Sequence, residues 1–398
     1  MKQVLILAAL ILSACHSRKE RLTTDPKIAL QNLDGQIEEL EKAHARSPEA
    51  LQFTGTLVGL LATRAQYLGR LSDYDRALAL AEEALHRAPD NESALLMRAG
   101  ARSSLHRFSD AMTDIDQATA TGAEPETIAV LRASILQAQG NLHEALAIWR
   151  KLGSSDSDIR TLGSLAVAEG EAGNRAEALR LFSAAVQRYR DVSPFPLAWI
   201  ELQEGMMWER DSELAKAQTH YEAARNYLPQ YAPATEHLAS VLMARGEYRQ
   251  AAALLRPLAE SCEDPEFAAL LATALVQLGD LKEGARYELA ARKRYDALVQ
   301  RHPEAFGDHA ARLWLAENPA KAFVLARQNL ANRKTPEAFE LAISAALAGG
   351  EQTTACELAG EALALERPAP RIHQLAARAF NTCGHPDRAD QERIAPSD

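Results

Sequence analysis

A small residue recurs along almost the whole 398-residue chain, at intervals of about 34 residues in most steps. Such a period is typical of a supersecondary unit that cannot bury its apolar face alone, so neighbouring units stack around a shared core. One repetitive array is therefore expected, although the length alone would suggest two or three domains. The recurring residues are Ala77, Ala111, Ala145, Ala178, Ala217, Ala251, Gly284, Ala322, Ala355 and Ala389.

Two further series run in phase with the first. Small residues lie twelve positions earlier in nine of the ten units, with Ile343 as the exception, and they let helices approach closely. Glycine lies five positions earlier in six units, where it can adopt the positive φ of a helix end. Each unit is therefore predicted to be helix, turn, helix. The six glycines are Gly140, Gly173, Gly246, Gly279, Gly350 and Gly384.

The combined pattern resembles the tetratricopeptide repeat (TPR) family, whose period is about 34 residues. The resemblance implies an all-α, right-handed superhelical solenoid of about nine to ten helix-turn-helix repeats over residues 49–398, with local contacts only and a concave surface. Four units depart from the pattern, because Ser72, His106, Ser212 and Glu317 replace the turn glycine. The two steps that end at Ala217 and Ala322 are longer than the others and predict longer helices or loops at those points.

The N-terminal region has the features of an exported, lipid-anchored protein. A positively charged start and a nine-residue apolar run form the layout of a signal peptide over residues 1–14. That run is too short to span a bilayer, which takes about 20 residues. The stretch LSAC, ending at Cys15, resembles the lipobox of bacterial lipoproteins. This resemblance implies a lipidated Cys15, with residues 15–24 as a polar tether; the alternative is a chance cysteine beside an ordinary export signal.

The lipobox resemblance also implies a location in the bacterial cell envelope. His16 and Ser17 follow the cysteine, where some lipoproteins carry an aspartate that favours retention at the inner membrane. The expectation is therefore a lipid anchor in the outer membrane, with the protein facing the periplasm. A formal net charge of −10, from 44 Lys+Arg and 54 Asp+Glu, argues against nucleic acid as a partner.

Residues 25–48 are predicted to form a helix that caps the array. Asp25 and Pro26 have the character of a helix cap and a first helical residue. An apolar stripe follows in heptad-like spacing, and the segment ends near Pro48. The stripe consists of Leu30, Leu33, Ile37 and Leu40.

Recognisable catalytic motifs are absent from the sequence. His143-Glu144 begins like a metalloprotease signature, but Ala147 occupies the place of the second histidine. There is no phosphate-binding glycine loop, no G-x-S-x-G elbow and no paired CxxC. His302 and His309 lie seven positions apart, and no cysteine lies near them in sequence. We therefore expect no catalytic residues, no metal site and no cofactor.

Three cysteines lie within the repeats. Cys356 begins the second helix of one predicted repeat, and Cys383 ends the first helix of the next, so antiparallel packing brings both ends together. A disulfide requires Cα atoms within about 7 Å, a distance that the sequence alone does not determine. Two alternatives remain open: a Cys356–Cys383 disulfide, or two buried thiols at these positions. Cys262 is expected to be unpaired.

The concave surface is where TPR proteins bind their partners. The first helix of the fifth predicted unit presents Trp199, Leu202 and Met206 there, and the next unit adds Glu236 and Met243. The centre of this groove is apolar, which favours a helix or an extended apolar peptide as the partner. The competing interpretation is that Trp199 belongs to the core.

Arg98 occupies a position that is usually apolar in these repeats. Asp114 lies on the paired helix of the same unit, within reach of the guanidinium group. An ion pair that holds the two helices together is therefore predicted.

These observations favour a membrane-anchored scaffold that binds a partner protein or peptide in its groove. The first alternative is a structural subunit of an envelope secretion or assembly complex, in which convex-face contacts dominate. The second is an enzyme with an unrecognised site. The identity of the partner and the oligomeric state remain open.

Overall fold

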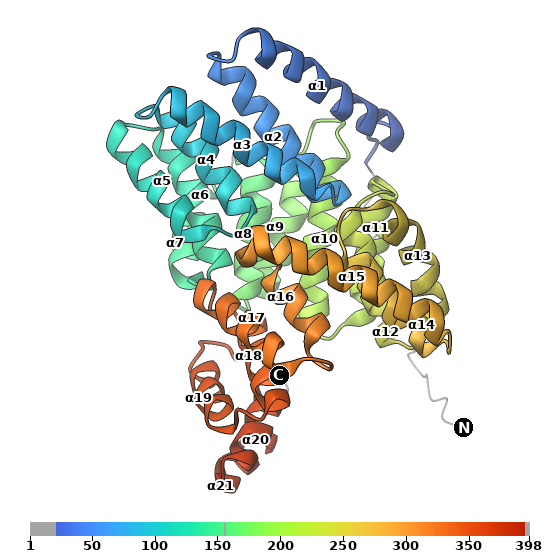
Figure 1. Ribbon diagram of the computed structural model, residues 1–398. Coiled ribbons are helices and arrows are strands. Elements are labelled where there is room, and N and C mark those ends of the chain that lie inside the picture. The colour runs from blue at the N-terminus through green and yellow to red at the C-terminus, as the bar shows by residue number, and fades with distance from the viewer. Residues whose placement is uncertain (1–20, 155–156, 395–398) are drawn as a thin grey trace, which may run out of the picture.

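A computed structural model describes residues 21–154 and 157–394 of the chain. This part contains 21 α-helices and no strand, wound into a superhelix (Figure 1). The residues 1–20, and with them the predicted signal peptide, Cys15 and most of the tether, lie outside the described part. The helices are α1 (Pro26–Arg46), α2 (Leu51–Leu68), α3 (Leu71–Arg87), α4 (Glu92–Ser104), α5 (Phe108–Thr121), α6 (Pro125–Ala138), α7 (Leu142–Leu152), α8 (Ile159–Glu171), α9 (Arg175–Arg188), α10 (Phe195–Arg210), α11 (Leu214–Tyr227), α12 (Ala232–Ala244), α13 (Tyr248–Ser261), α14 (Glu266–Gln277), α15 (Leu281–Arg301), α16 (Pro303–Trp314), α17 (Pro319–Asn332), α18 (Pro336–Gly349), α19 (Gln352–Leu363), α20 (Pro370–Thr382) and α21 (Pro386–Ile394).

Each helix packs against its sequence neighbours, and the recurring small residues lie where paired helices cross. A Cβ atom at Gly205 of α10 would lie 2.5 Å from the ring of Tyr221 in α11, so only glycine permits this packing. All six predicted turn glycines have a positive φ, and His106 and Ser212 adopt the same conformation where they replace glycine. The predicted all-α, right-handed TPR solenoid is confirmed.

The irregular steps of the repeat have two different causes. Helix α15 is extended to 21 residues, which accounts for the long step that ends at Ala322. The long step that ends at Ala217 coincides with the connection 189–194 between α9 and α10.

The N-terminal helix α1 forms as the sequence predicts. Asp25 caps it by accepting hydrogen bonds from the backbone of Lys27 and Ile28. Its buried residues are Ala29, Leu33 and Ile37. The described part of the chain includes no helix long and apolar enough to cross a membrane.

Successive turns of the superhelix contact each other, which corrects the expectation of local contacts only. The backbone N–H of Lys334 donates to the carbonyl of Gln139 at 2.9 Å, and the side-chain amide of Asn332 donates to the carbonyl of His106 at 2.9 Å. The partners in the second of these bonds lie 226 positions apart in sequence. The superhelix therefore returns onto itself after about six repeats, and the second turn packs on the first.

A buried aromatic contact lies at the same interface between turns. Tyr67 of α2 stacks on Tyr231, which directly precedes α12, with 4.7 Å between ring centroids. The buried thiol of Cys262 lies 3.3 Å from the carbonyl oxygen of Gly69, so this cysteine packs between turns. These contacts join residues that are far apart in the chain and hold the turns together.

Candidate partner-binding cavity

A cavity of about 700 Å³ opens on the inner side of the first superhelical turn. Helices α1, α2, α6, α7, α8 and α10 contribute its walls, together with the connection 191–194. Most polar groups in the walls are uncharged amides and hydroxyls, which can both donate and accept hydrogen bonds. The cavity can therefore bind an uncharged polar chain, such as a peptide backbone. These groups belong to Asn32, Gln36, Thr63, Gln66, Ser134, Thr161 and Ser164, and the charged side chains are Arg160 and Asp191.

Trp199 of α10 is one of the wall residues and provides an aromatic surface in this cavity. Its ring crosses to the preceding repeat and lies against Gly163 of α8, where a Cβ atom would be 2.5 Å from ring carbon Cζ3. Gly163 therefore provides the space that fixes the position of the indole. The ring is partly buried, and its remaining surface is available inside the cavity.

Tyr67 and Phe195 form a rigid corner of the cavity. The Tyr67 hydroxyl donates a hydrogen bond to the carbonyl oxygen of Phe195 at 2.9 Å, and the two rings meet edge to face at 5.1 Å. Burial raises the pKa of Tyr67 above its usual range, so the phenol stays protonated and keeps this hydrogen bond. The corner links α2 to α10 and holds the mouth of the cavity in place.

The five residues predicted to contact a partner lie in different environments in the structure. Trp199 lines the cavity, whereas Leu202 is 4% exposed and packs in the core around α10–α14, which corrects the expectation that it contacts a partner. Met206 and Met243 are partly buried against the same core. Glu236 is half-buried and is not a wall residue of the cavity. The open surface therefore lies on the N-terminal side of the groove predicted from sequence.

Glu236 lies in a network of carboxylates and imidazoles. Burial, together with the nearby Glu266 carboxylate, raises the pKa of Glu236 to about 7. Although burial opposes its charged form, the Asp308 carboxylate and a hydrogen bond to Glu266 raise the pKa of His309 above its usual range. His309 Nδ1 lies 3.1 Å from the Glu266 carboxylate, which also accepts a hydrogen bond from the Tyr295 hydroxyl.

A second imidazole belongs to this network. His237 Nδ1 lies 2.9 Å from the Glu209 carboxylate, and the Tyr221 hydroxyl donates to the same carboxylate. Although burial opposes its charged form, the hydrogen bond to Glu209 raises the pKa of His237. Charged pairs thus connect α10 to α12 and α14 to α16, in and beside the region where the sequence predicts an apolar groove.

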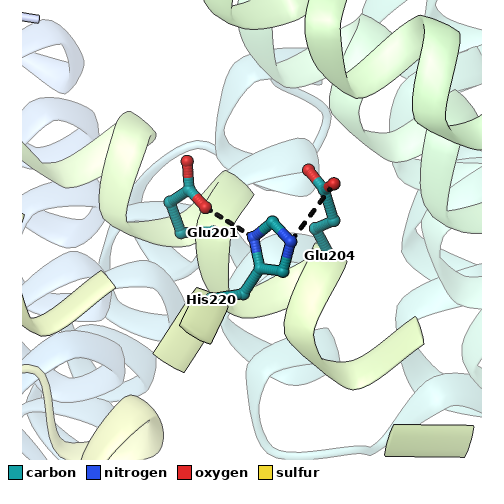
Figure 2. Close-up of side chains that lie close together, drawn as sticks. All are labelled: Glu201, Glu204 and His220. Carbon is teal, nitrogen blue, oxygen red and sulfur yellow. Dashed lines mark hydrogen bonds and ion pairs between the residues drawn. The ribbon is translucent and has the colours of Figure 1, made fainter. Parts of the chain in front are cut away.

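Glu201, Glu204 and His220 form a separate cluster between α10 and α11 (Figure 2). His220 Nδ1 lies 2.7 Å from the Glu201 carboxylate, and His220 Nε2 lies 3.4 Å from the Glu204 carboxylate. One donor atom from each residue lies within 4.8 Å of the others, and both glutamates are 6% exposed. Carboxylates and imidazole can together bind a divalent metal such as zinc. The sequence predicts no metal site here. The pattern that could have indicated one is that Glu201 and Glu204 occupy repeat positions that hold leucine in several other repeats.

Arg98 and Asp114 meet as the sequence suggests. Arg98 Nη2 lies 2.6 Å from Asp114 Oδ1, and Arg98 Nε lies 3.1 Å from Asp114 Oδ2. Arg102 also donates to Asp114, at 2.8 Å, and this second arginine was not identified from the sequence. The Asp114 carboxylate is fully buried, whereas the two arginine side chains are 21% and 14% exposed. The cluster therefore joins α4 to α5 through three charge-assisted hydrogen bonds.

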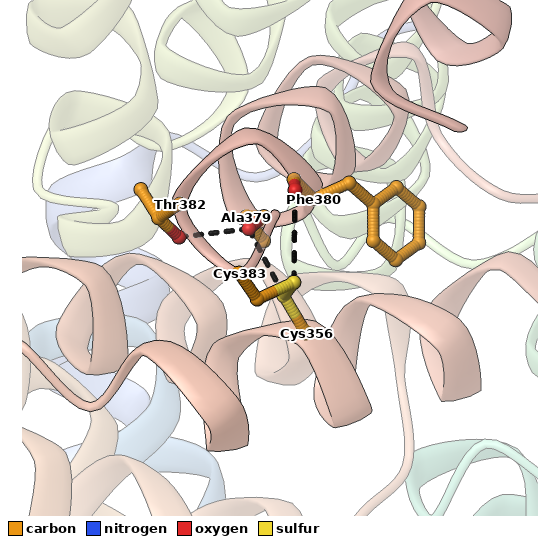
Figure 3. The surroundings of a disulfide bond; sticks show 5 residues. All are labelled: Cys356, Ala379, Phe380, Thr382 and Cys383. Carbon is orange, nitrogen blue, oxygen red and sulfur yellow. Dashed lines mark hydrogen bonds between the residues drawn. A yellow bond between two sulfur atoms is a disulfide. The ribbon is translucent and has the colours of Figure 1, made fainter. Parts of the chain in front are cut away.

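The structure joins Cys356 of α19 to Cys383, directly after α20, in a disulfide (Figure 3). The Cα atoms are 6.6 Å apart, within the range that a disulfide spans. The Cys356 sulfur lies 2.9 Å from the carbonyl oxygen of Ala379 in α20. The bond fixes adjacent helices near the C-terminal end of the solenoid, at the opposite end from α1 and α2 (Figure 1).

No protein-family model and no curated protein matches this sequence. Three solved structures share its helical architecture at low identity. Yeast Tom70 is 14% identical over 93% of this chain and 98% of its own, with a TM-score of 0.39. The pilF protein of Pseudomonas aeruginosa is 16% identical over 53% of this chain and 92% of its own, with a TM-score of 0.39. The human IFIT1 dimer with m7Gppp-AAAA is 12% identical over 91% of this chain and 93% of its own, with a TM-score of 0.42.

Proposed function

We propose that this protein is a lipid-anchored scaffold that holds a short extended segment of a partner protein in the cavity of its first superhelical turn. The observation that carries the proposal is the cavity itself. It combines the indole of Trp199 with a wall of uncharged hydrogen-bonding side chains. Aromatic side chains are frequent binding hot spots, and amides and hydroxyls can pair with a peptide backbone.

The size of the cavity favours an extended segment over a helix. Its volume of about 700 Å³ lies within the range of about 300–1,000 Å³ found for ligand pockets. A helix with its side chains is about 10–12 Å wide and would need a longer, open groove. The partner is therefore expected to insert a few residues in extended conformation.

The lipid anchor is the second part of the proposal. Its support is the stretch LSAC ending at Cys15, placed after a short apolar run. Acylation at Cys15 and export to the envelope fit a TPR solenoid whose disulfide is stable in an oxidising compartment. The outer membrane facing the periplasm is the proposed location.

Site-specific photocrosslinking tests the cavity as the binding site. A photoreactive amino acid replaces Gln66, an exposed residue in the cavity wall, in cells that make the full chain. The matched control carries it at Gln250, an exposed glutamine of α13 outside the wall. We expect a discrete adduct with one envelope protein from position 66 only. Adducts from position 250 alone would contradict the cavity and favour a structural subunit with outer-face contacts.

A further inference from the structure

The described chain begins on the body of the solenoid, where it is held by several hydrogen bonds. The Arg21 guanidinium donates to the carbonyl oxygens of Gln187 and Tyr189, each at 2.7 Å. The Thr24 backbone N–H donates to the carbonyl of Val192 at 2.7 Å. Residues 21–24 are therefore fixed beside the connection between α9 and α10.

Large apolar side chains are exposed at this junction. Leu22 is 96% exposed, Val192 is 58% exposed, and Ile28 in the first turn of α1 is 50% exposed. They are three of the nine large hydrophobic side chains that are exposed in the described part of the chain. Such residues cluster where a surface meets another apolar phase. We call these three side chains the junction patch.

The charges around the junction patch differ from those of the whole molecule. The residues at the junction include three basic and two acidic ones, which leaves a formal charge of +1 there: Arg21, Lys27 and Arg190 against Asp25 and Asp191. The whole chain carries −10. The junction is therefore a region where an acidic protein can approach anionic lipid without electrostatic repulsion.

The distance to the proposed lipid anchor is short. Arg21 is the sixth residue after Cys15, and a fully extended chain spans at most about 3.3–3.6 Å per residue. An acylated Cys15 would hold the junction patch within about 20 Å of the membrane surface. We propose that the junction patch rests on the phospholipid surface; this inference rests on the proposed acylation of Cys15.

This contact would orient the cavity. Thr24, Asp191 and Val192 belong both to the junction and to the cavity wall. Docking of the junction patch therefore places the mouth of the cavity next to the membrane. A partner segment would then enter from a membrane-proximal protein.

A fluorescence experiment on the acylated full chain tests the membrane contact. Val192→Cys receives an environment-sensitive fluorophore, and Thr353→Cys on α19 is the matched control at an exposed site distant from α1. The native cysteines do not compete, because Cys262 is buried and Cys356 is bonded to Cys383. Each protein is placed in phosphatidylethanolamine–phosphatidylglycerol vesicles that contain spin-labelled lipid.

We expect a blue-shifted emission and strong quenching at position 192, with neither at position 353. Leu22→Ser and Ile28→Ser together should reduce quenching at position 192 while the acylated protein still floats with the vesicles. A probe at position 192 that stays water-exposed in floating protein would overturn the membrane contact. Protein that carries no acyl chain by mass spectrometry would instead overturn the anchor on which it rests.

Discussion

Removal of the charges around Asp114 tests how the α4–α5 pair is held together. Arg98→Leu removes two of the three hydrogen bonds to the carboxylate but leaves Arg102 in place. A hydrogen bond to a charged group contributes about 1.5–3 kcal/mol. Because Arg102 still pairs with the carboxylate, we expect the total loss of unfolding free energy to be about that of one such bond, less than the sum of two. Arg98→Leu with Arg102→Leu strands a fully buried carboxylate. Breaking a buried ion pair in this way costs about 3–5 kcal/mol.

Adding Asp114→Leu to the two arginine substitutions supplies the decisive comparison. A buried ion cluster can often be replaced by apolar side chains without loss of stability, so the triple variant should recover most of the unfolding free energy. The assay is urea denaturation of the full chain followed by far-UV circular dichroism. Arg132→Leu, which breaks a more exposed pair with Asp116, is the control and should cost about 0–1 kcal/mol. Additive losses in the triple variant would refute the ion cluster, because independent side chains do not compensate for each other.

Three further predictions concern other parts of the chain. Burial beside Glu266 raises the pKa of Glu236 from 4.5 to about 7, so the folded state keeps a proton that the unfolded chain loses. The free energy of unfolding should therefore fall as pH rises from about 4.5 to about 7, and urea titrations of Glu236→Gln should lack this fall. Reduction of the Cys356–Cys383 disulfide, whose cysteines are 27 positions apart, should lower the local free energy of unfolding by about 3–4 kcal/mol. Hydrogen exchange in α19–α21 should therefore become faster. In the Cys356→Ser, Cys383→Ser double variant, reductant should not change the exchange rates. Cys15→Ser should abolish palmitate labelling and release the protein from membranes, and unchanged labelling would contradict the anchor.

Much of the fold could be predicted because each repeat contacts its neighbours through residues at fixed spacings. The small residues at helix crossings and the turn glycines repeat in phase, so the helix pairs and their turns follow from sequence alone. Contacts between superhelical turns carry no such signal. The backbone hydrogen bond from Lys334 to Gln139 depends on the accumulated twist of many repeats, and no local pattern reports that twist.

The same limit applies to the cavity. Trp199 was identified because it lies at a concave position of its own repeat, whereas its packing against Gly163 of the preceding repeat is seen only in the structure. The amides of α1 and α2 belong to a different part of the chain and meet Trp199 only when the first turn is formed. Leu202 shows the opposite error, because helical spacing does not reveal that the core around α10–α14 covers that part of α10.

The most direct test of the central claim compares Trp199 with Met243 in binding to the partner identified by crosslinking. Both side chains are partly buried against the core, but Trp199 also lines the cavity, whereas Met243 lies outside its walls. Truncation of an aromatic hot spot costs about 2 kcal/mol or more, or about 30-fold in Kd. The account predicts that Trp199→Ala weakens binding by at least that factor and that Met243→Ala leaves Kd unchanged, with similar melting temperatures. Full affinity in Trp199→Ala together with a large loss in Met243→Ala would contradict the cavity as the binding site.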